Sequence, residues 1–235
     1  MGRWSLATLL GLGLIAGCTA PLASAADGNQ AGHSYLALGD SYTSGQSVAP
    51  QERWPVQLAQ TLTSQGWACA QPLIIARTGW TTAELSDALH ERAPHGPFDL
   101  VTLLIGVNDQ YRGHALATYQ AAFIALLGDA ITLAGGHADH VVVLSIPDWG
   151  VTPFAAGQDR DAISASITAF NHQAQQDVTT RGAHWVDIFP LSRDLAGGEQ
   201  IAPDGLHPSG RMYARWVAAA APVVLGIDQG LAHPR

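Results

Sequence analysis

The chain has 235 residues, of which 47% are apolar and 13% charged, and its net charge is -8. A chain this long and this apolar can bury a core of its own, which excludes a disordered protein. The acidic balance, without any visible cluster of Lys and Arg, argues against a nucleic-acid partner. We expect one folded domain behind a processing segment, and a monomer.

The first 25 residues have the pattern of an export signal. A short basic segment precedes an apolar run at 6–16, which is too short to cross a membrane as a helix. Two cleavage sites compete. The small residues at 23–25 predict a signal peptide of residues 1–25, whereas the Ile-Ala-Gly-Cys sequence ending at Cys18 resembles the bacterial lipobox. In that second case the signal ends at residue 17, and a lipid on Cys18 anchors the protein to a membrane. Both alternatives predict an exported protein, either secreted or held as a lipoprotein in the periplasm or on the outer membrane.

After a linker that ends near residue 32, short apolar runs alternate with stretches of helical spacing. The runs typical of strands are, in chain order, 33–38, 73–76, 99–105, 141–146 and 184–188. The helical stretches are 53–65, one that begins with a capping box at Thr81, 116–133, 161–181 and 209–225. Alternation without hairpin signals predicts βαβ units. We therefore expect an α/β fold over residues 33–228, a three-layer α/β/α sandwich around a five-stranded parallel sheet.

Four polar segments stand at strand ends or before the last helix, at 39–45, 77–81, 106–109 and 204–209. Ligands bind at the carboxyl ends of the strands in such sheets, so these segments are the candidate site. The Ser41 hydroxyl is a nucleophile once a base takes its proton, and His207 is the candidate base. The nine other histidines lack a comparable setting.

In this order the four segments resemble the motif blocks of the SGNH hydrolases, the GDSL-type esterases and lipases. The resemblance spans residues 39–209 and implies a flavodoxin-like fold and a hydrolase of ester bonds that uses no metal and no cofactor. It implies that Ser41 is the nucleophile and that Asp204 orients His207. The oxyanion donors that it implies are the backbone N–H groups of Ser41 and Gly79 and the side-chain amide of Asn108.

Several alternatives stay open at this point. An α/β-hydrolase is disfavoured because Thr43 stands where the nucleophile elbow of that fold has glycine. Ser41 could be only a helix cap. A metal site at Asp204 and His207 lacks a third ligand nearby in the sequence. The competing functions are a non-catalytic ligand-binding protein on the same fold, and a phosphodiesterase or metal-dependent enzyme. Asp40 and Asp109 are interpreted as structural residues of their turns.

Aromatic residues close to these segments predict a substrate pocket formed by Trp80, Tyr111, Trp149 and Phe154. The alternative is that they only anchor their loops. No long apolar lid is visible, so we expect a short-chain acyl ester, a lysophospholipid or an acetylated carbohydrate as substrate.

Cys18 is either cleaved off with the signal peptide or carries a lipid. Cys69 is then the one remaining thiol, and we expect it to be buried and inert.

Overall fold

The computed structural model describes residues 1–2, 32–196 and 199–231. Both predicted cleavage sites, at Cys18 and after residue 25, lie outside the described residues.

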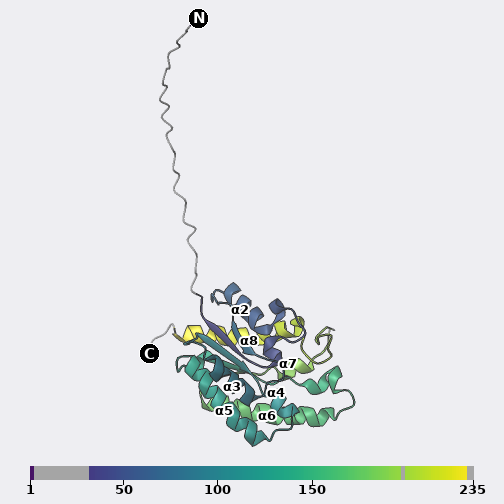
Figure 1. The fold of residues 1–235 in the computed structure, drawn as a ribbon. Coiled ribbons are helices and arrows are strands. Elements are labelled where there is room, and N and C mark those ends of the chain that lie inside the picture. Colours follow the sequence, from purple (N-terminus) through teal and green to yellow (C-terminus); the bar gives the residue numbers. More distant parts are fainter. Residues whose placement is uncertain (3–31, 197–198, 232–235) are drawn as a thin grey trace. The chain divides into compact units, whose positions relative to one another are not determined.

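The centre of the molecule is a parallel sheet of five strands (Figure 1). The strands are β1 (Tyr35–Gly39), β2 (Leu73–Ala76), β3 (Leu100–Leu104), β4 (Val141–Leu144) and β5 (His184–Val186). They lie in the order β2-β1-β3-β4-β5, and every neighbouring pair is parallel, which confirms the predicted sheet. The chain leaves β1 toward β2 and returns to β3 on the other side. This reversal creates a switch point between β1 and β3, where a crevice forms at the carboxyl ends of the strands.

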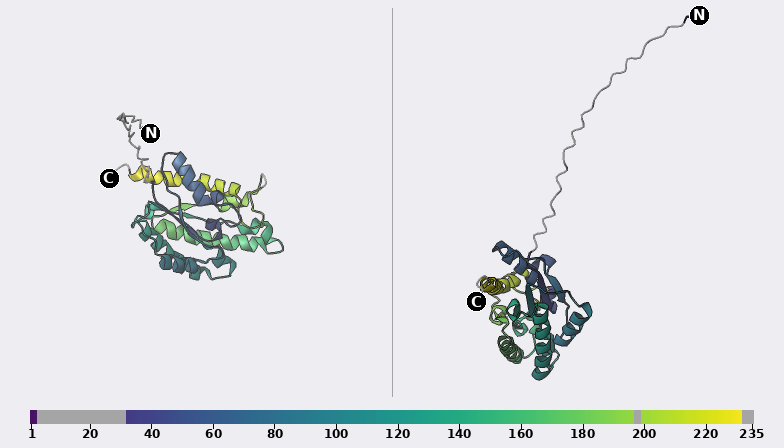
Figure 2. Two further views of the ribbon diagram at one scale, coloured as in Figure 1. Left: turned by 45° about the horizontal axis from the view of Figure 1, so that its top comes forward. Right: turned by 90° about the vertical axis from the view of Figure 1, so that its left-hand side faces the viewer.

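Long helices cover both faces of the sheet, as Figures 1 and 2 show. On one face α2 (Trp54–Ser64) packs against α8 (Gly210–Leu231). On the other face α5 (Leu116–Leu133) lies between α3 (Thr82–Arg92) and α6 (Arg160–Thr180). The three-layer α/β/α sandwich is therefore confirmed. The predicted capping box is also present, because Thr81 and Glu84 satisfy each other's backbone N–H at the start of α3.

By length and composition, α5 is apolar enough to cross a membrane. Its place in the fold explains that composition, since it packs against β3 and against the helices on either side of it. The side chains that it buries recur at helical spacing: Tyr119, Phe123, Leu126, Leu127 and Ala130. Tyr119 stacks on Phe170 of α6 with ring centroids 4.7 Å apart. The helix thus has the apolar stripe of a core helix.

Short helices follow three of the strands, and the sequence pattern did not predict them. They are α1 (Ser41–Ser44), α4 (Val107–Tyr111) and α7 (Phe189–Arg193). Four or five residues make little more than one turn, which is too short to show a 3.6-residue period. The first two carry predicted site residues.

Cys69 is half-buried, not fully buried as expected. Its burial, assisted by the nearby Asp99 carboxylate, raises the pKa of the thiol to about 12. The thiol is therefore protonated at neutral pH, and its inertness stays a prediction.

Candidate active site

A tight turn at the end of β1 presents Ser41. A Cβ atom on Gly39 would lie 2.5 Å from the carbonyl oxygen of Leu104 in β3 and would also meet Oγ1 of Thr43. Only glycine therefore allows the two strands to approach this closely here. Asp40 is the N-cap of α1, where its Oδ1 accepts the N–H of Tyr42 at 3.0 Å. Ser41 is thus the first residue of the helix and not its cap, and it is only 5% exposed.

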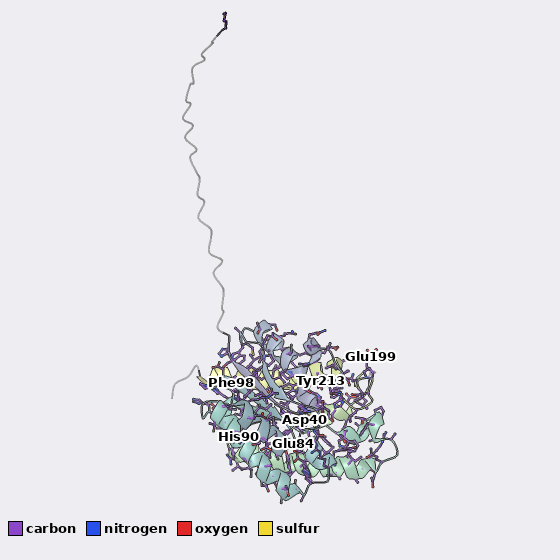
Figure 3. All side chains as sticks on the ribbon, in the orientation of Figure 1. Asp40, Glu84, His90, Phe98, Glu199 and Tyr213 are labelled. Atoms are coloured by element: carbon purple, nitrogen blue, oxygen red, sulfur yellow. The ribbon has the colours of Figure 1, made fainter. Side chains whose placement is uncertain are left out.

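The Asp40 carboxyl group is completely buried. Figure 3 labels its position in the fold. Its Oδ2 atom has no hydrogen-bond partner among the residues that the structure describes. Burial raises the pKa of Asp40 to about 7, and the Asp109 carboxylate adds to this effect, whereas the hydrogen bond from Tyr42 opposes it. A carboxyl group is therefore held next to Ser41 in an environment that favours its neutral form.

Hydrogen-bond donors of Ser41, Gly79 and Asn108, which follow three different strands, line one cavity together with His207. Within the described part of the chain, the backbone N–H groups of Ser41 and Gly79 donate to no protein acceptor. The side-chain amide of Asn108 donates one hydrogen to the carbonyl of Trp80 at 2.9 Å, and its second hydrogen remains available. Unused donors at one cavity are what an oxyanion site requires.

Neighbouring side chains fix the loops that carry these donors. Gly79 has a φ of 86°, which only glycine adopts without strain, and its carbonyl accepts Nη2 of Arg112 at 2.5 Å. Arg112 also pairs with Glu84 on α3 at 3.3 Å. The Asp109 carboxylate accepts both the N–H and the hydroxyl of Thr82 at 2.9 Å, which ties α4 to α3. Asp109 therefore makes contacts of the structural kind expected for it.

His207 and Asp204 lie in one loop before α8. Nδ1 of His207 is 2.7 Å from Oδ2 of Asp204. Partial burial alone would raise the pKa of Asp204, but hydrogen bonds, led by the one from Ser47, outweigh it and lower the pKa to about 2. The carboxylate is thus ionised at neutral pH and can only accept, so Nδ1 carries the hydrogen. Nε2 of the neutral imidazole is then the basic atom. The ring of Tyr42 packs edge-on against the imidazole, with ring centroids 5.6 Å apart.

The cavity between these loops has a volume of about 160 Å³ and mostly apolar walls. Its aromatic wall consists of Tyr111, Trp149 and Phe154, whose ring centroids are 5.5 to 6.3 Å apart. Nε1 of Trp149 donates to Gln110 on α4 at 2.9 Å, which fixes its ring. Tyr111 and Phe154 are 57% and 43% exposed and form the rim of the wall.

The sequence matches the family described as GDSL-like lipase/acylhydrolase over residues 37–215. The chain belongs to this family. The protein is therefore an ester-bond hydrolase, and the resemblance of its four motif segments is confirmed. A comparison with curated proteins gave no match.

Several solved structures share the fold of this GDSL-like hydrolase. TesA is 20% identical with a TM-score of 0.64, and the match covers 83% of this chain and 99% of TesA. Axe2, an acetylxylan esterase from Geobacillus stearothermophilus, is 17% identical with a TM-score of 0.64, covering 82% of this chain and 94% of Axe2. The psychrotrophic esterase EstA from Pseudoalteromonas sp., in a structure inhibited by monoethylphosphonate, is 18% identical with a TM-score of 0.55, covering 84% of this chain and 95% of EstA.

The structure corrects one member of the predicted pocket. Trp80 is partly buried against the hydrophobic core and is not among the residues that line the cavity. Four other residues that line the cavity lie in the predicted site segments but were not singled out: Tyr42, Thr78, Val107 and Leu206. Each of them is adjacent in sequence to a predicted site residue, which is the signal that could have found them.

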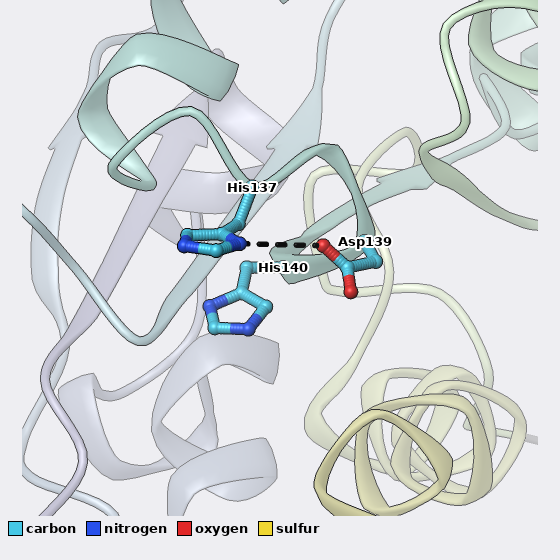
Figure 4. A group of neighbouring side chains, drawn as sticks. All are labelled: His137, Asp139 and His140. Carbon is cyan, nitrogen blue, oxygen red and sulfur yellow. Dashed lines mark ion pairs between the residues drawn. The ribbon is translucent and has the colours of Figure 1, made fainter. Parts of the chain in front are cut away.

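A second cluster of side chains of metal-ligand type lies at the amino end of β4, opposite to the carboxyl ends of the strands. It consists of His137, Asp139 and His140 (Figure 4). The two imidazoles stack with centroids 4.9 Å apart and planes 25° from parallel. Ring nitrogens ligate a metal along their own ring planes at about 2.0–2.1 Å, and lone pairs in nearly parallel stacked planes do not converge on one ion. In this arrangement the cluster is an aromatic stack, and Nδ1 of His137 faces Asp139 at 4.0 Å.

Proposed function

We propose that this hydrolase cleaves short-chain acyl esters through an acyl-enzyme, with Ser41 as nucleophile and His207 as base. The observation that carries the proposal is the cavity itself. It is lined by Ser41, Gly79, Asn108 and His207. The ionised Asp204 accepts a hydrogen bond from Nδ1 of His207.

In the first step, Ser41 Oγ attacks the carbonyl carbon of the ester while its proton passes to Nε2 of His207. The carbonyl oxygen becomes an oxyanion, which accepts hydrogen bonds from the N–H groups of Ser41 and Gly79 and from the amide of Asn108. Asp204 stabilises the imidazolium that forms. The ester C–O bond then breaks, and the leaving alkoxide takes the proton from His207.

Water completes the reaction. His207, now neutral, removes a proton from a water molecule, which attacks the carbonyl carbon of the acyl-enzyme. The second tetrahedral intermediate uses the same oxyanion donors. Its collapse releases the carboxylic acid and returns the proton to Ser41.

The size and chemistry of the cavity support a short acyl group. Its volume of about 160 Å³ is below the range of roughly 300–1,000 Å³ that is typical of sites for drug-sized ligands. Its walls offer apolar surface for methyl and methylene groups. Axe2, which shares the fold, is an acetylxylan esterase, and an acetyl ester fits the same expectation here.

The test measures hydrolysis of p-nitrophenyl esters with acyl chains from acetyl to palmitoyl, using the wild type, Ser41→Ala and a matched control, Ser64→Ala. Ser64 lies exposed on α2, and among the described residues its hydroxyl bonds only to the carbonyl of Thr61. We expect Ser41→Ala to lose roughly 10⁴-fold or more in kcat while Ser64→Ala stays at the wild-type rate. We expect kcat/KM to be highest for acetyl or butyryl esters.

A p-nitrophenyl organophosphonate gives an independent readout. Oγ of an active serine forms a bond to its phosphorus and displaces p-nitrophenolate. We expect one adduct, located on Ser41 by peptide mass spectrometry and missing in Ser41→Ala. Full turnover by Ser41→Ala would refute the nucleophile assignment. A lack of turnover by the wild type across all esters would favour the ligand-binding alternative.

A further inference from the structure

Burial alone does not fix the Asp204 carboxylate, because 30% of its side chain is exposed. An exposed carboxylate is hydrated and rotates unless hydrogen bonds hold it. Here Oδ1 accepts the backbone N–H groups of Leu206 and His207, both at 2.9 Å. These two bonds come from its own loop and leave the orientation of Oδ2 to its other partners.

Oδ2 accepts two groups. One is Nδ1 of His207 at 2.7 Å, and the other is the hydroxyl of Ser47 at 2.5 Å. Among the described residues, Ser47 is the one donor to Asp204 that comes from outside the loop at 204–207, and it lies 157 residues away in the sequence. The bond therefore connects the segment that follows the nucleophile to the loop that carries the base.

The backbone of Ser47 indicates that this position requires a side chain. Its φ is 65°, in the left-handed region that a residue with a Cβ adopts at a cost. The chain uses glycine at most of its positive-φ positions, including Gly45 two residues earlier. Glycine at position 47 would relieve the strain, but it would donate nothing to Asp204. Strain of this kind persists where surrounding contacts determine the conformation.

The residue before Ser47 makes a similar contact in another direction. Oε1 of Gln46 accepts the hydroxyl of Thr78 at 2.5 Å, next to Gly79. The segment after α1 thus contacts both of the loops with which Ser41 must be aligned. It is a connection between loops rather than a free surface turn.

We propose that Ser47 is a positioning residue, whose hydroxyl holds the Asp204 carboxylate in the orientation in which Oδ2 accepts the Nδ1–H of His207. The proposal rests on the proposed function, because it assigns Ser47 a role in orienting the base for Ser41. Ser47 itself touches no reacting atom. Its removal changes how often the imidazole is correctly aligned, which affects the chemical step and not the binding of substrate.

The experiment compares Ser47→Ala, Ser47→Gly and Ser47→Asn in the full chain, with p-nitrophenyl acetate as substrate. Alanine removes the hydroxyl and keeps the backbone strain, glycine removes both, and asparagine tolerates a positive φ and offers an amide donor. We expect kcat to fall by about threefold to tenfold in the alanine and glycine variants, with KM within twofold of wild type. We expect asparagine to restore kcat at least in part.

Thermal unfolding separates this role from a purely structural one. The midpoint temperature should be higher for the glycine and asparagine variants than for alanine, because both relieve the strain. The order of stability then differs from the order of kcat, in which glycine groups with alanine.

Wild-type kcat in both the alanine and the glycine variants would overturn the positioning role, as would a rise in KM at unchanged kcat. Ser41→Ala is measured in parallel. If that variant is inactive, the proposed function stands whatever the Ser47 variants do, and if it is active, the proposed function fails independently of Ser47.

Discussion

Replacing Gly39 with alanine tests how closely β1 and β3 must approach for the site to form. The new Cβ would lie 2.5 Å from the carbonyl oxygen of Leu104, where non-bonded contacts need about 3.0 Å or more. The contacting atom of Leu104 belongs to the backbone, and Thr43 is fully buried, so neither can move aside alone. The strands must therefore separate by about 0.5 Å at this end. Overpacking of this kind costs about 1–3 kcal/mol.

For a chain of this size, a loss of about 2 kcal/mol lowers the midpoint of thermal unfolding by roughly 4–8 °C. Ser41 follows two residues later, so the displacement also reaches the proposed nucleophile. Since a misplacement of about 1 Å costs about 10²-fold in rate, a shift of half that size should lower kcat by about tenfold. Calorimetry and hydrolysis of p-nitrophenyl acetate measure the two effects.

The matched control is Gly226→Ala in α8, where a Cβ meets no atom within 4 Å and the helix gains from alanine. That variant should keep the wild-type rate and unfold at the same or a higher temperature. A Gly39→Ala protein with the wild-type midpoint and the wild-type kcat would show that the strands yield at little cost. The close-approach reasoning would then be refuted.

Two further predictions concern polar groups of the site. Asn108→Ala should lower kcat by roughly 10²–10³-fold with little change in KM, as for other oxyanion donors, and a loss below threefold would remove Asn108 from that role. Asp40→Asn should stabilise the protein more at pH 8 than at pH 5. The gain in the free energy of unfolding should differ between the two pH values by at most a few kcal/mol, since one pKa unit corresponds to about 1.4 kcal/mol. The reason is that a carboxyl group with a raised pKa supports the fold while protonated, and this support is lost as pH rises from the ordinary value of 3.8 through about 7. Urea unfolding of both proteins at the two pH values checks the sign, and an equal difference at both would contradict it.

The architecture was predictable because hydrophobic periodicity is local. The bounds of β2 and α5 agree with the sequence pattern residue for residue, and the capping box at Thr81 is where its side chains indicate. Periodicity does not predict the order of the strands, since it depends on which side of β1 each crossover returns to. That order was implied only by the resemblance to a flavodoxin-like fold. The helices α1 and α4 were missed because helices of four and five residues are too short to show a period.

The same distinction applies to the site. Ser41, Gly79, Asn108 and His207 were predicted from four short motifs, and the structure brings them to one cavity. Trp80 was assigned to the pocket from its position next to Gly79, but adjacency along a chain does not fix the side to which a side chain turns. The supporting contacts could not be predicted in this way. Arg112 on Gly79 depends on how two loops meet in three dimensions and not on any local pattern.

The bond between Ser47 and Asp204 also has a consequence for how the protein acquires activity. Its two ends are 157 residues apart, and His207, which we propose it helps to orient, lies just before α8. Closing a loop of this length costs conformational entropy, and contacts of this kind slow folding. A chain with a complete sheet but with the loop before α8 displaced would present Ser41 without an oriented imidazole. Activity therefore tests contacts between distant parts of the chain, which secondary structure alone does not measure.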